Sequence, residues 1–76
     1  MYQTGDLIKA EFRDEHSGEV EWMWVKVQRV DDALRVVFGI LDSEPVAMSN
    51  LHLGMDLAVS YDNIRDHRTA SSFRPV

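Results

Sequence analysis

The run from Val20 to Val30, which reads VEWMWVKVQRV, is the longest strand pattern in the chain. Apolar Met23, Val25 and Val27 stand at every second position of this run, and side chains two residues apart point to the same face of a strand. We therefore expect one long strand that buries this apolar face. The opposite face then carries Trp22, Trp24, Lys26 and Gln28.

The segments on either side of this run also predict strands. Residues 7–13 alternate between apolar and charged side chains, and the polar segment 14–19 contains Ser17-Gly18, which favours a tight turn. A hairpin between the first two strands follows. After the acidic pair at 31–32, residues 34–41 predict a third, central strand. Gly39 inside it indicates a bulge or a close approach by another backbone.

The second half of the chain is less regular. Pro45 ends the third strand because proline has no backbone N–H to donate to a ladder. We expect a short edge strand over 46–51 and a further strand over 53–61, where apolar residues again alternate. Residues 62–66 predict one helical turn with Asp62 as its N-cap. No segment has the pattern of a longer amphipathic helix.

Five short strands, frequent turns and the absence of a long helix favour a small all-β sandwich or barrel. Because 76 residues are few for two full sheets, the best fit is a five-stranded SH3-like, partly open barrel with one short helical turn near the C-terminus. A barrel of the OB type is the alternative. We expect residues 1–67 to form this single domain and residues 68–76 to be a mobile tail.

The composition narrows the classes of function. The chain has no cysteine, which rules out disulfides and thiolate metal sites and fits a cytoplasmic location. Its net charge of −5 opposes nucleic-acid binding, which needs clustered cations. No apolar run is long enough to cross a membrane. We expect neither a metal nor another cofactor, and no membrane association.

The sequence also predicts that the protein is not an enzyme. It contains no Gly-x-Ser-x-Gly elbow for a nucleophilic serine. Its paired acids, Asp14-Glu15 and Asp31-Asp32, fall in predicted turns, where carboxylates are simply solvated. A chain of this length also has little volume for a pocket that encloses a substrate.

Four segments carry a resemblance to a known family: EWMWV at 21–25, FGILDSEP at 38–45, LGMD at 53–56 and IRDH at 64–67. In this order they resemble the YegJ-like family of bacterial domains, the domain of unknown function 2314. The sequence departs from that family's pattern at Trp22, where a histidine is usual, and at His67, where a tryptophan is usual. The resemblance implies a small bacterial domain without an established activity.

Two surfaces are candidates for binding a protein partner. Trp22 and Trp24 form the first, with Lys26 and Gln28 beside them, because tryptophan is enriched where interfaces gain most of their binding energy. This surface predicts a non-catalytic protein-interaction module. Packing of the tryptophans against the bent sheet is the competing explanation.

The second candidate is an acidic hairpin formed by Asp14, Glu15, Glu19 and Glu21. It would suit an inhibitor or immunity-type protein that neutralises a basic partner. The competing explanation is that these charges protect the edge of the sheet from pairing with other chains. A third hypothesis is a homodimer, because a core this small gains stability from self-association.

Overall fold

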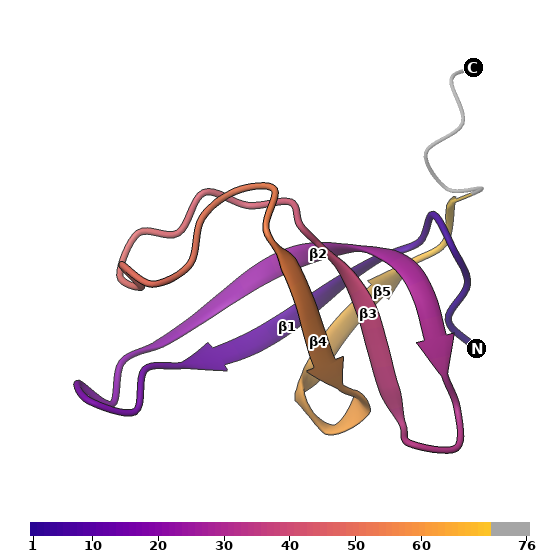
Figure 1. Ribbon diagram of the computed structural model, residues 1–76, viewed down its shortest axis with the longest axis horizontal. Coiled ribbons are helices and arrows are strands. Elements are labelled where there is room, and N and C mark those ends of the chain that lie inside the picture. The colour runs from indigo at the N-terminus through magenta and orange to yellow at the C-terminus, as the bar shows by residue number, and fades with distance from the viewer. Residues whose placement is uncertain (71–76) are drawn as a thin grey trace.

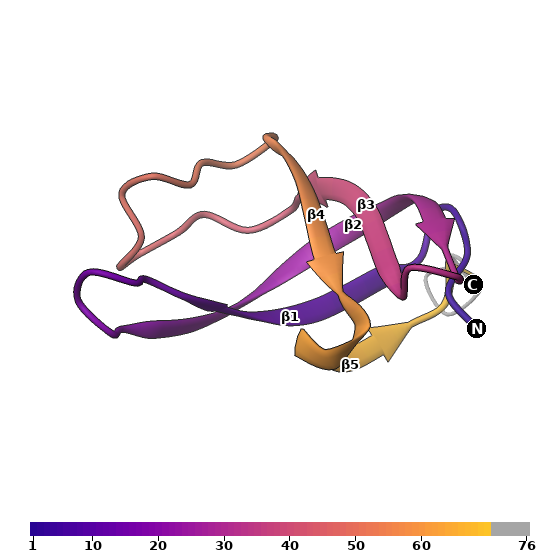
Figure 2. The same cartoon turned by 60° about the horizontal axis from the view of Figure 1, so that its bottom comes forward.

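Five antiparallel strands form one sheet in the computed structural model, which describes residues 1–70 (Figure 1). The strand order is β4-β3-β2-β1-β5, with β4 and β5 at the two edges. The sheet bends without closing into a full barrel, and a short 3-10 turn, η1, joins its two edge strands (Figure 2). The predicted all-β, SH3-like, partly open architecture is confirmed. Its elements are β1 (Leu7–Arg13), β2 (Val20–Asp31), β3 (Val36–Leu41), β4 (Asp56–Ser60), η1 (Tyr61–Asn63) and β5 (Ile64–Arg68).

Strand β2 belongs to both halves of the bent sheet. It pairs with β1 from Val20 to Lys26 and with β3 from Val25 to Asp31. A bulge at Gln28 interrupts the β3 ladder, because Val27 lies opposite Gly39 whereas Arg29 already lies opposite Phe38. Bulges of this kind bend a strand and increase its twist. One strand can therefore line both halves of the core.

Gly39 lets two backbones come together at this bend. A Cβ atom placed on Gly39 would collide with the carbonyl oxygen of Lys26 and would lie 2.8 Å from Cγ1 of Val25. No other residue type fits without a shift of the backbone. The close approach predicted at Gly39 is confirmed, and the bulge lies on the neighbouring strand β2, at Gln28.

The core lies on the inner face of the bent sheet. Every second side chain of β1, β2 and β3 points into it, as the period-two pattern predicts. Met48, from the long segment between β3 and β4, joins the strand residues and is only 3% exposed. The buried hydrophobic residues are Ile8, Ala10, Met23, Val25, Val27, Val37, Leu41, Met48 and Val59.

The predicted strand over 46–51 is wrong. These residues form bends and turns, and Val46 is almost fully exposed while Met48 is buried. The segment from 42 to 55 is therefore a long loop, anchored by Met48 in the core, with Leu51 and Met55 packed against the core, rather than by a strand ladder. The strand predicted over 53–61 is shorter, because β4 starts only at Asp56, after the positive φ of Gly54.

Two further boundaries differ from the prediction. The strand predicted from residue 34 starts at Val36, because Arg35 has a positive φ of 55° and Leu34 donates its N–H to the Asp31 carboxylate in a turn. The predicted helical turn over 62–66 is a 3-10 turn over Tyr61–Asn63, whose N-cap is Ser60 and not Asp62. The residues after it form β5, a strand that the sequence pattern did not indicate.

Tyr61 fixes this turn against the β2–β3 hairpin. Its hydroxyl donates a hydrogen bond of 2.7 Å to the Asp32 carboxylate, and its backbone N–H donates to the carbonyl of Arg35. Partial burial of the phenol and the bond to Asp32 raise the pKa of Tyr61 to about 12. The hydroxyl therefore stays protonated and keeps donating throughout the neutral range.

Asp6 ties the two ends of the described chain together. Its carboxylate is buried, with the whole residue 3% exposed, and lies 2.8 Å from Nε2 of His67. It also accepts the N–H groups of Gln3 and Ala70 at 2.9 and 3.0 Å. The ring of Tyr2 packs edge-on against His67. Residues 68–70 of the expected tail are thus attached here, and the rest of that tail lies outside the described residues.

The environment of Asp6 favours its ionised form. Burial alone raises the pKa of the carboxyl, but the hydrogen bonds from His67, Ala70 and Gln3 together hold the pKa below its ordinary value. The folded-state pKa is then lower than the unfolded-state pKa of about 3.9. The stabilisation from Asp6 is complete above that unfolded-state value and is lost as the pH falls through the folded-state pKa.

We predict that Asp6→Asn lowers the free energy of unfolding at neutral pH by about 1–3 kcal/mol, because it disturbs a buried hydrogen-bond network. The variant should also lose the part of the acid destabilisation that comes from Asp6. Urea denaturation from neutral pH down to the acid transition measures both effects. The exposed Asp56→Asn is the control and should follow the wild type. An Asp6→Asn profile parallel to that of the wild type would contradict this role.

We predict that Gly39→Ala destabilises the fold by about 1–3 kcal/mol, because the new methyl group collides with the Lys26 carbonyl. The matched control is Gly18→Asn in the β1–β2 turn. That glycine has a φ of +76° with open space around it, and asparagine tolerates this conformation. Urea midpoints compare the two variants. Equal midpoints would show that the backbones at the bend are not in tight contact.

Candidate functional site

The predicted tryptophan surface lies on the outer face of β2. Trp22 is 55% exposed, Trp24 is half-buried and Lys26 is exposed. Gln28 is exposed as well but occupies the bulge, and its carbonyl accepts a bond from the Thr4 hydroxyl. Beyond the bulge the alternation of faces shifts by one residue. Arg29, rather than Gln28, then lies on the outer face opposite Phe38.

Two cations from other strands lie over the ring of Trp24. The Nζ atom of Lys9 is 5.1 Å from the ring centroid, and the guanidinium carbon of Arg68 is 5.3 Å from it. Both distances are within the range of cation–π attraction. The backbone of Trp24 is also fixed, because its N–H donates to the Ser43 hydroxyl and its carbonyl accepts from the N–H of Asp42. Trp24 is therefore held in place before any partner binds.

Strand pairing brings further charged residues to this face. Lys9 is paired with Trp24 and Glu11 with Trp22, and Leu7 lies between Lys26 on β2 and Arg68 on β5. Arg65 reaches the same face by donating from Nε to the Glu11 carboxylate at 3.2 Å. We call this surface the tryptophan face. It consists of Leu7, Lys9, Glu11, Arg13, Trp22, Trp24, Lys26, Arg65, Asp66 and Arg68.

The tryptophan face holds five of the eight cations in the chain, Lys9, Arg13, Lys26, Arg65 and Arg68. Of these five cations, only Lys26 was predicted from the sequence to lie beside the tryptophans. The alternation of Lys9, Glu11 and Arg13 along residues 7–13 was the available signal for the β1 members. Nothing in the sequence pointed to the β5 members, because β5 itself was not predicted.

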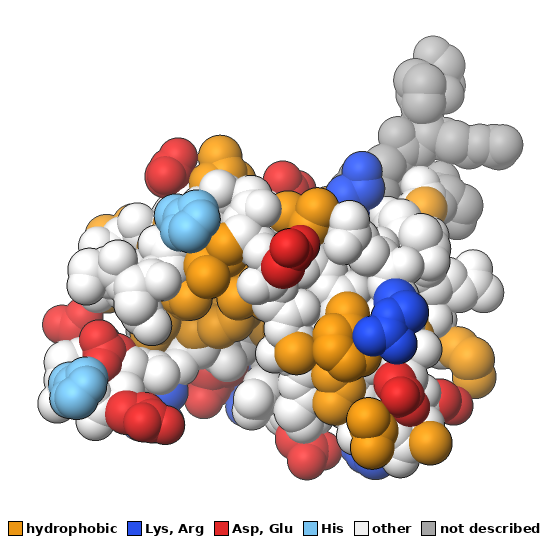
Figure 3. All heavy atoms as spheres, in the orientation of Figure 1, with side chains coloured by type: hydrophobic (Ala, Val, Ile, Leu, Met, Phe, Trp, Pro, Cys, Tyr) orange, Lys and Arg blue, Asp and Glu red, His pale blue; other side chains and the backbone are white. Residues whose placement is uncertain are grey.

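The predicted acidic hairpin is divided by the fold. Asp14 uses its carboxylate within the turn, where it accepts the N–H groups of His16 and Ser17. Glu21 points to the 42–55 loop. Glu15 and Glu19 are exposed at the hairpin end, and acidic side chains gather around that end of the molecule (Figure 3). Only two of the four acids are therefore free to meet a partner.

Glu21 connects the β1–β2 hairpin to the 42–55 loop. Its carboxylate oxygens accept the N–H groups of Val46 and Ala47 at 2.9–3.2 Å. These two residues immediately precede Met48, which enters the core. The carboxylate thereby satisfies the backbone groups of a segment that has no ladder of its own. Glu21 therefore has a structural role, because its carboxylate holds this part of the loop.

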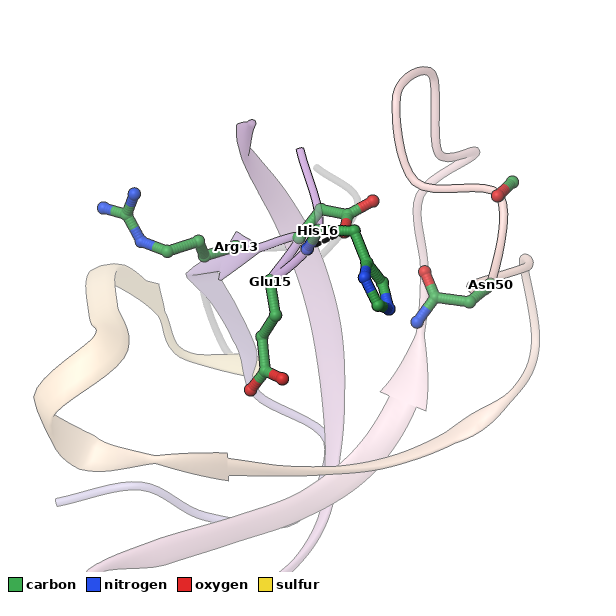
Figure 4. A pocket seen from close by; sticks show the side chains of 6 residues that line it. Arg13, Glu15, His16 and Asn50 are labelled. Atoms are coloured by element: carbon green, nitrogen blue, oxygen red, sulfur yellow. Dashed lines mark hydrogen bonds between the residues drawn. The ribbon is translucent and has the colours of Figure 1, made fainter. Parts of the chain in front are cut away.

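A hollow of about 430 Å³ lies between the end of this hairpin and the far end of the 42–55 loop. In the close-up view the ring of His16 and the amide of Asn50 face each other across it, while Arg13 points away (Figure 4). The dashed bond runs from the His16 N–H to Asp14, within the turn itself. The hollow is polar and of mixed charge, and is lined by Arg13, Asp14, Glu15, His16, Ser49 and Asn50.

Other surfaces offer less specific features. An apolar area over β3 and β4 includes the half-buried Phe38 and Ile40 (Figure 3). The guanidinium of Arg29 covers the Phe38 ring at 4.1 Å. Within residues 1–70, no three metal-ligating side chains gather into one group. The same residues contain no helix with the length and hydrophobicity that a membrane crossing requires.

A family model described as an uncharacterised protein conserved in bacteria, DUF2314, matches residues 2–75. The chain belongs to the DUF2314 family. The match spans every strand from β1 to β5, so this DUF2314 chain carries the tryptophan face within the family region. The resemblance drawn from its four segments is confirmed for the domain of unknown function. Neither the curated proteins nor the solved structures provide a match.

We predict that Glu21→Gln releases the 42–55 loop of this DUF2314 domain. A neutral amide accepts hydrogen bonds more weakly than a carboxylate, and its NH2 group would replace an oxygen that now accepts from Val46, so we expect a loss of about 1–2 kcal/mol. Hydrogen exchange of the Val46 and Ala47 amides, followed by NMR, should accelerate. Glu19→Gln on the same hairpin is the control. Unchanged exchange at Val46 and Ala47 would show that Glu21 does not hold the loop.

Proposed function

We propose that this DUF2314 protein is a non-catalytic protein-interaction module whose contact surface is the tryptophan face. The observation that carries the proposal is the position of Trp22. More than half of this large indole is exposed on a regular strand, beside a second tryptophan that is already held in place. Tryptophan is enriched at the energetic centres of interfaces.

The energy available from Trp22 supports a role in binding. An indole buries about 150–250 Å² when it is fully enclosed. The exposed half corresponds to about 100 Å², and covering it contributes roughly 2–3 kcal/mol at about 25 cal/mol per Å². The scaffold below Trp22 is a paired strand, so little backbone entropy is lost when a partner docks.

The non-catalytic part of the proposal rests on the chemistry of the polar hollow in Figure 4. Glu15 and His16 are exposed residues of a hairpin turn, and solvation there leaves no low-dielectric site in which a general acid or base gains strength. We place the protein in the cytoplasm as part of the same proposal, since its lack of cysteine suits a reducing compartment.

The inhibitor or immunity-type alternative has weaker support. It requires the acidic hairpin to act as one surface, yet Asp14 and Glu21 are engaged inside the fold. Glu15 and Glu19 remain for a basic partner. Two exposed carboxylates in water contribute little to affinity, because exposed ion pairs are typically worth less than about 1 kcal/mol.

We predict that Trp22→Ala lowers the capture of a partner from native bacterial lysate by roughly tenfold or more, as expected for a residue at the energetic centre of an interface. Mass spectrometry quantifies the proteins retained by the wild type and by the variant. The matched control is Leu34→Ala, which truncates another exposed apolar side chain, in the turn between β2 and β3.

If Trp22→Ala captures the partner as well as Leu34→Ala does, the contact surface is not at Trp22, and the proposed placement is contradicted. Loss of the partner on Glu15→Lys and Glu19→Lys, with Trp22→Ala unaffected, would favour the acidic alternative. Sedimentation of the isolated wild type tests self-association directly. A dimer that dissociates on Trp22→Ala would identify the second copy of the chain as the partner.

A further inference from the structure

Some cations of the tryptophan face form ion pairs with a carboxylate, and others do not. Arg65 and Arg13 share one acceptor, the Glu11 carboxylate, at 3.2 and 3.9 Å. Within residues 1–70, Lys9, Lys26 and Arg68 form no ion pair. Lys9 and Arg68 lie over the Trp24 ring, and Lys26 is the next outward residue along β2. Among the described residues, the face therefore presents three cations without a carboxylate partner, gathered around one indole.

The acids of this face do not cancel that charge. Glu11 is already shared by two guanidinium groups, and the Asp66 carboxylate accepts the N–H of the next residue at 2.8 Å. A third carboxylate, Asp42, lies at the border of the face in a pocket shared with Leu7 and Lys26. Five cations against these three carboxylates still leave the face positive, although the whole chain carries a net charge of −5. Local charge and total charge have opposite signs.

Distance keeps the acidic hairpin end from neutralising the tryptophan face. Lys9 and Arg13 are four residues apart on β1, which is about 13 Å at about 3.3 Å per residue. Glu15 and Glu19 lie beyond Arg13, in the turn. The Debye length is about 8 Å at physiological ionic strength. A partner in contact with Trp24 therefore experiences Lys9, Lys26 and Arg68 more strongly than the acidic turn.

The edge strand next to this face adds a way to bind an extended chain. Within the part of the chain that the structure describes, β5 pairs with β1 on one side only, so its other side carries backbone groups that can pair with an added strand. Arg68 belongs to this edge strand and also reaches Trp24. An extended peptide along β5 would thus bring its side chains next to the three cations.

We propose that the tryptophan face binds an acidic polypeptide segment of the partner, with carboxylates at Lys9, Lys26 and Arg68 and an apolar side chain against Trp22. This proposal rests on the proposed function and specifies the chemistry of its partner. A polypeptide is favoured over single-stranded nucleic acid for two reasons. A continuous polyanion would meet the repulsion of the whole acidic chain, and it could not use the backbone groups of β5.

The test uses defined probes and the whole chain. Three short fluorescent peptides alternate valine with glutamate, with glutamine or with lysine. They differ mainly in charge, which is negative, neutral and positive. A short single-stranded oligothymidine represents nucleic acid. Fluorescence anisotropy measures the binding of each probe to the wild type. We expect the glutamate peptide to bind at least roughly tenfold more tightly than the others, and its affinity to fall as salt is raised.

Charge reversal locates the site. Arg68→Glu and Lys26→Glu should each weaken binding of the glutamate peptide by roughly tenfold, which corresponds to about 1.4 kcal/mol. Arg29→Glu is a matched control, because Arg29 is also exposed, also covers an aromatic ring and also forms no ion pair within residues 1–70. It should bind as the wild type does. Arg68→Gln provides a milder variant, and circular dichroism confirms that each variant is folded.

Three binding results would contradict the proposal that the partner segment is acidic. They are tighter binding of oligothymidine than of the glutamate peptide, tighter binding of the lysine peptide, and an equal loss of affinity in Arg29→Glu and Arg68→Glu. Failure of the glutamate peptide to bind would also overturn it. If a captured partner is still lost on Trp22→Ala in that case, the interaction module stands and only the chemistry assigned to its partner is wrong.

Discussion

The close approach of two backbones at Gly39 is the constraint on which the rest of the fold depends. Because Gly39 has no side chain, the carbonyl of Lys26 can pack against β3, and the bulge at Gln28 turns β2 from one half of the sheet to the other. The same strand then buries Met23, Val25 and Val27 on its inner face. Its outer face carries both tryptophans, so the bend that makes the core also sets the orientation of the proposed binding surface.

The buried Asp6 carboxylate completes that surface from the other end of the chain. By accepting bonds from His67 and Ala70, it fastens the end of β5 beside the start of β1. Arg65 and Arg68 reach the tryptophan face only because β5 is paired there. Stability and proposed function are therefore coupled. A variant that weakens the Asp6 network also displaces cations that are far from Trp24 in the sequence.

Period-two alternation explains what could be predicted from the sequence. It placed Trp22 and Trp24 on one face and identified β1 and β2, because each buries one side against the core. It could not identify β5, whose residues Ile-Arg-Asp-His-Arg include one apolar side chain and form an exposed edge. It misassigned 46–51, since Met48 fills the core from a loop. Arg65 and Arg68 were missed together with β5, because they reach the tryptophan face through the β1–β5 pairing.

The central claim is that the tryptophan face, and not the acidic hairpin end, is the surface that meets a partner. The most direct measurement is an NMR titration of the isotope-labelled protein with the captured partner, following every backbone amide. If the tryptophan face is the contact surface, shift changes will concentrate on β2, β1 and β5 around Trp22, Trp24 and Arg68. Changes confined to the turn around Glu15 and Glu19, or to the hollow beside Asn50, would contradict it.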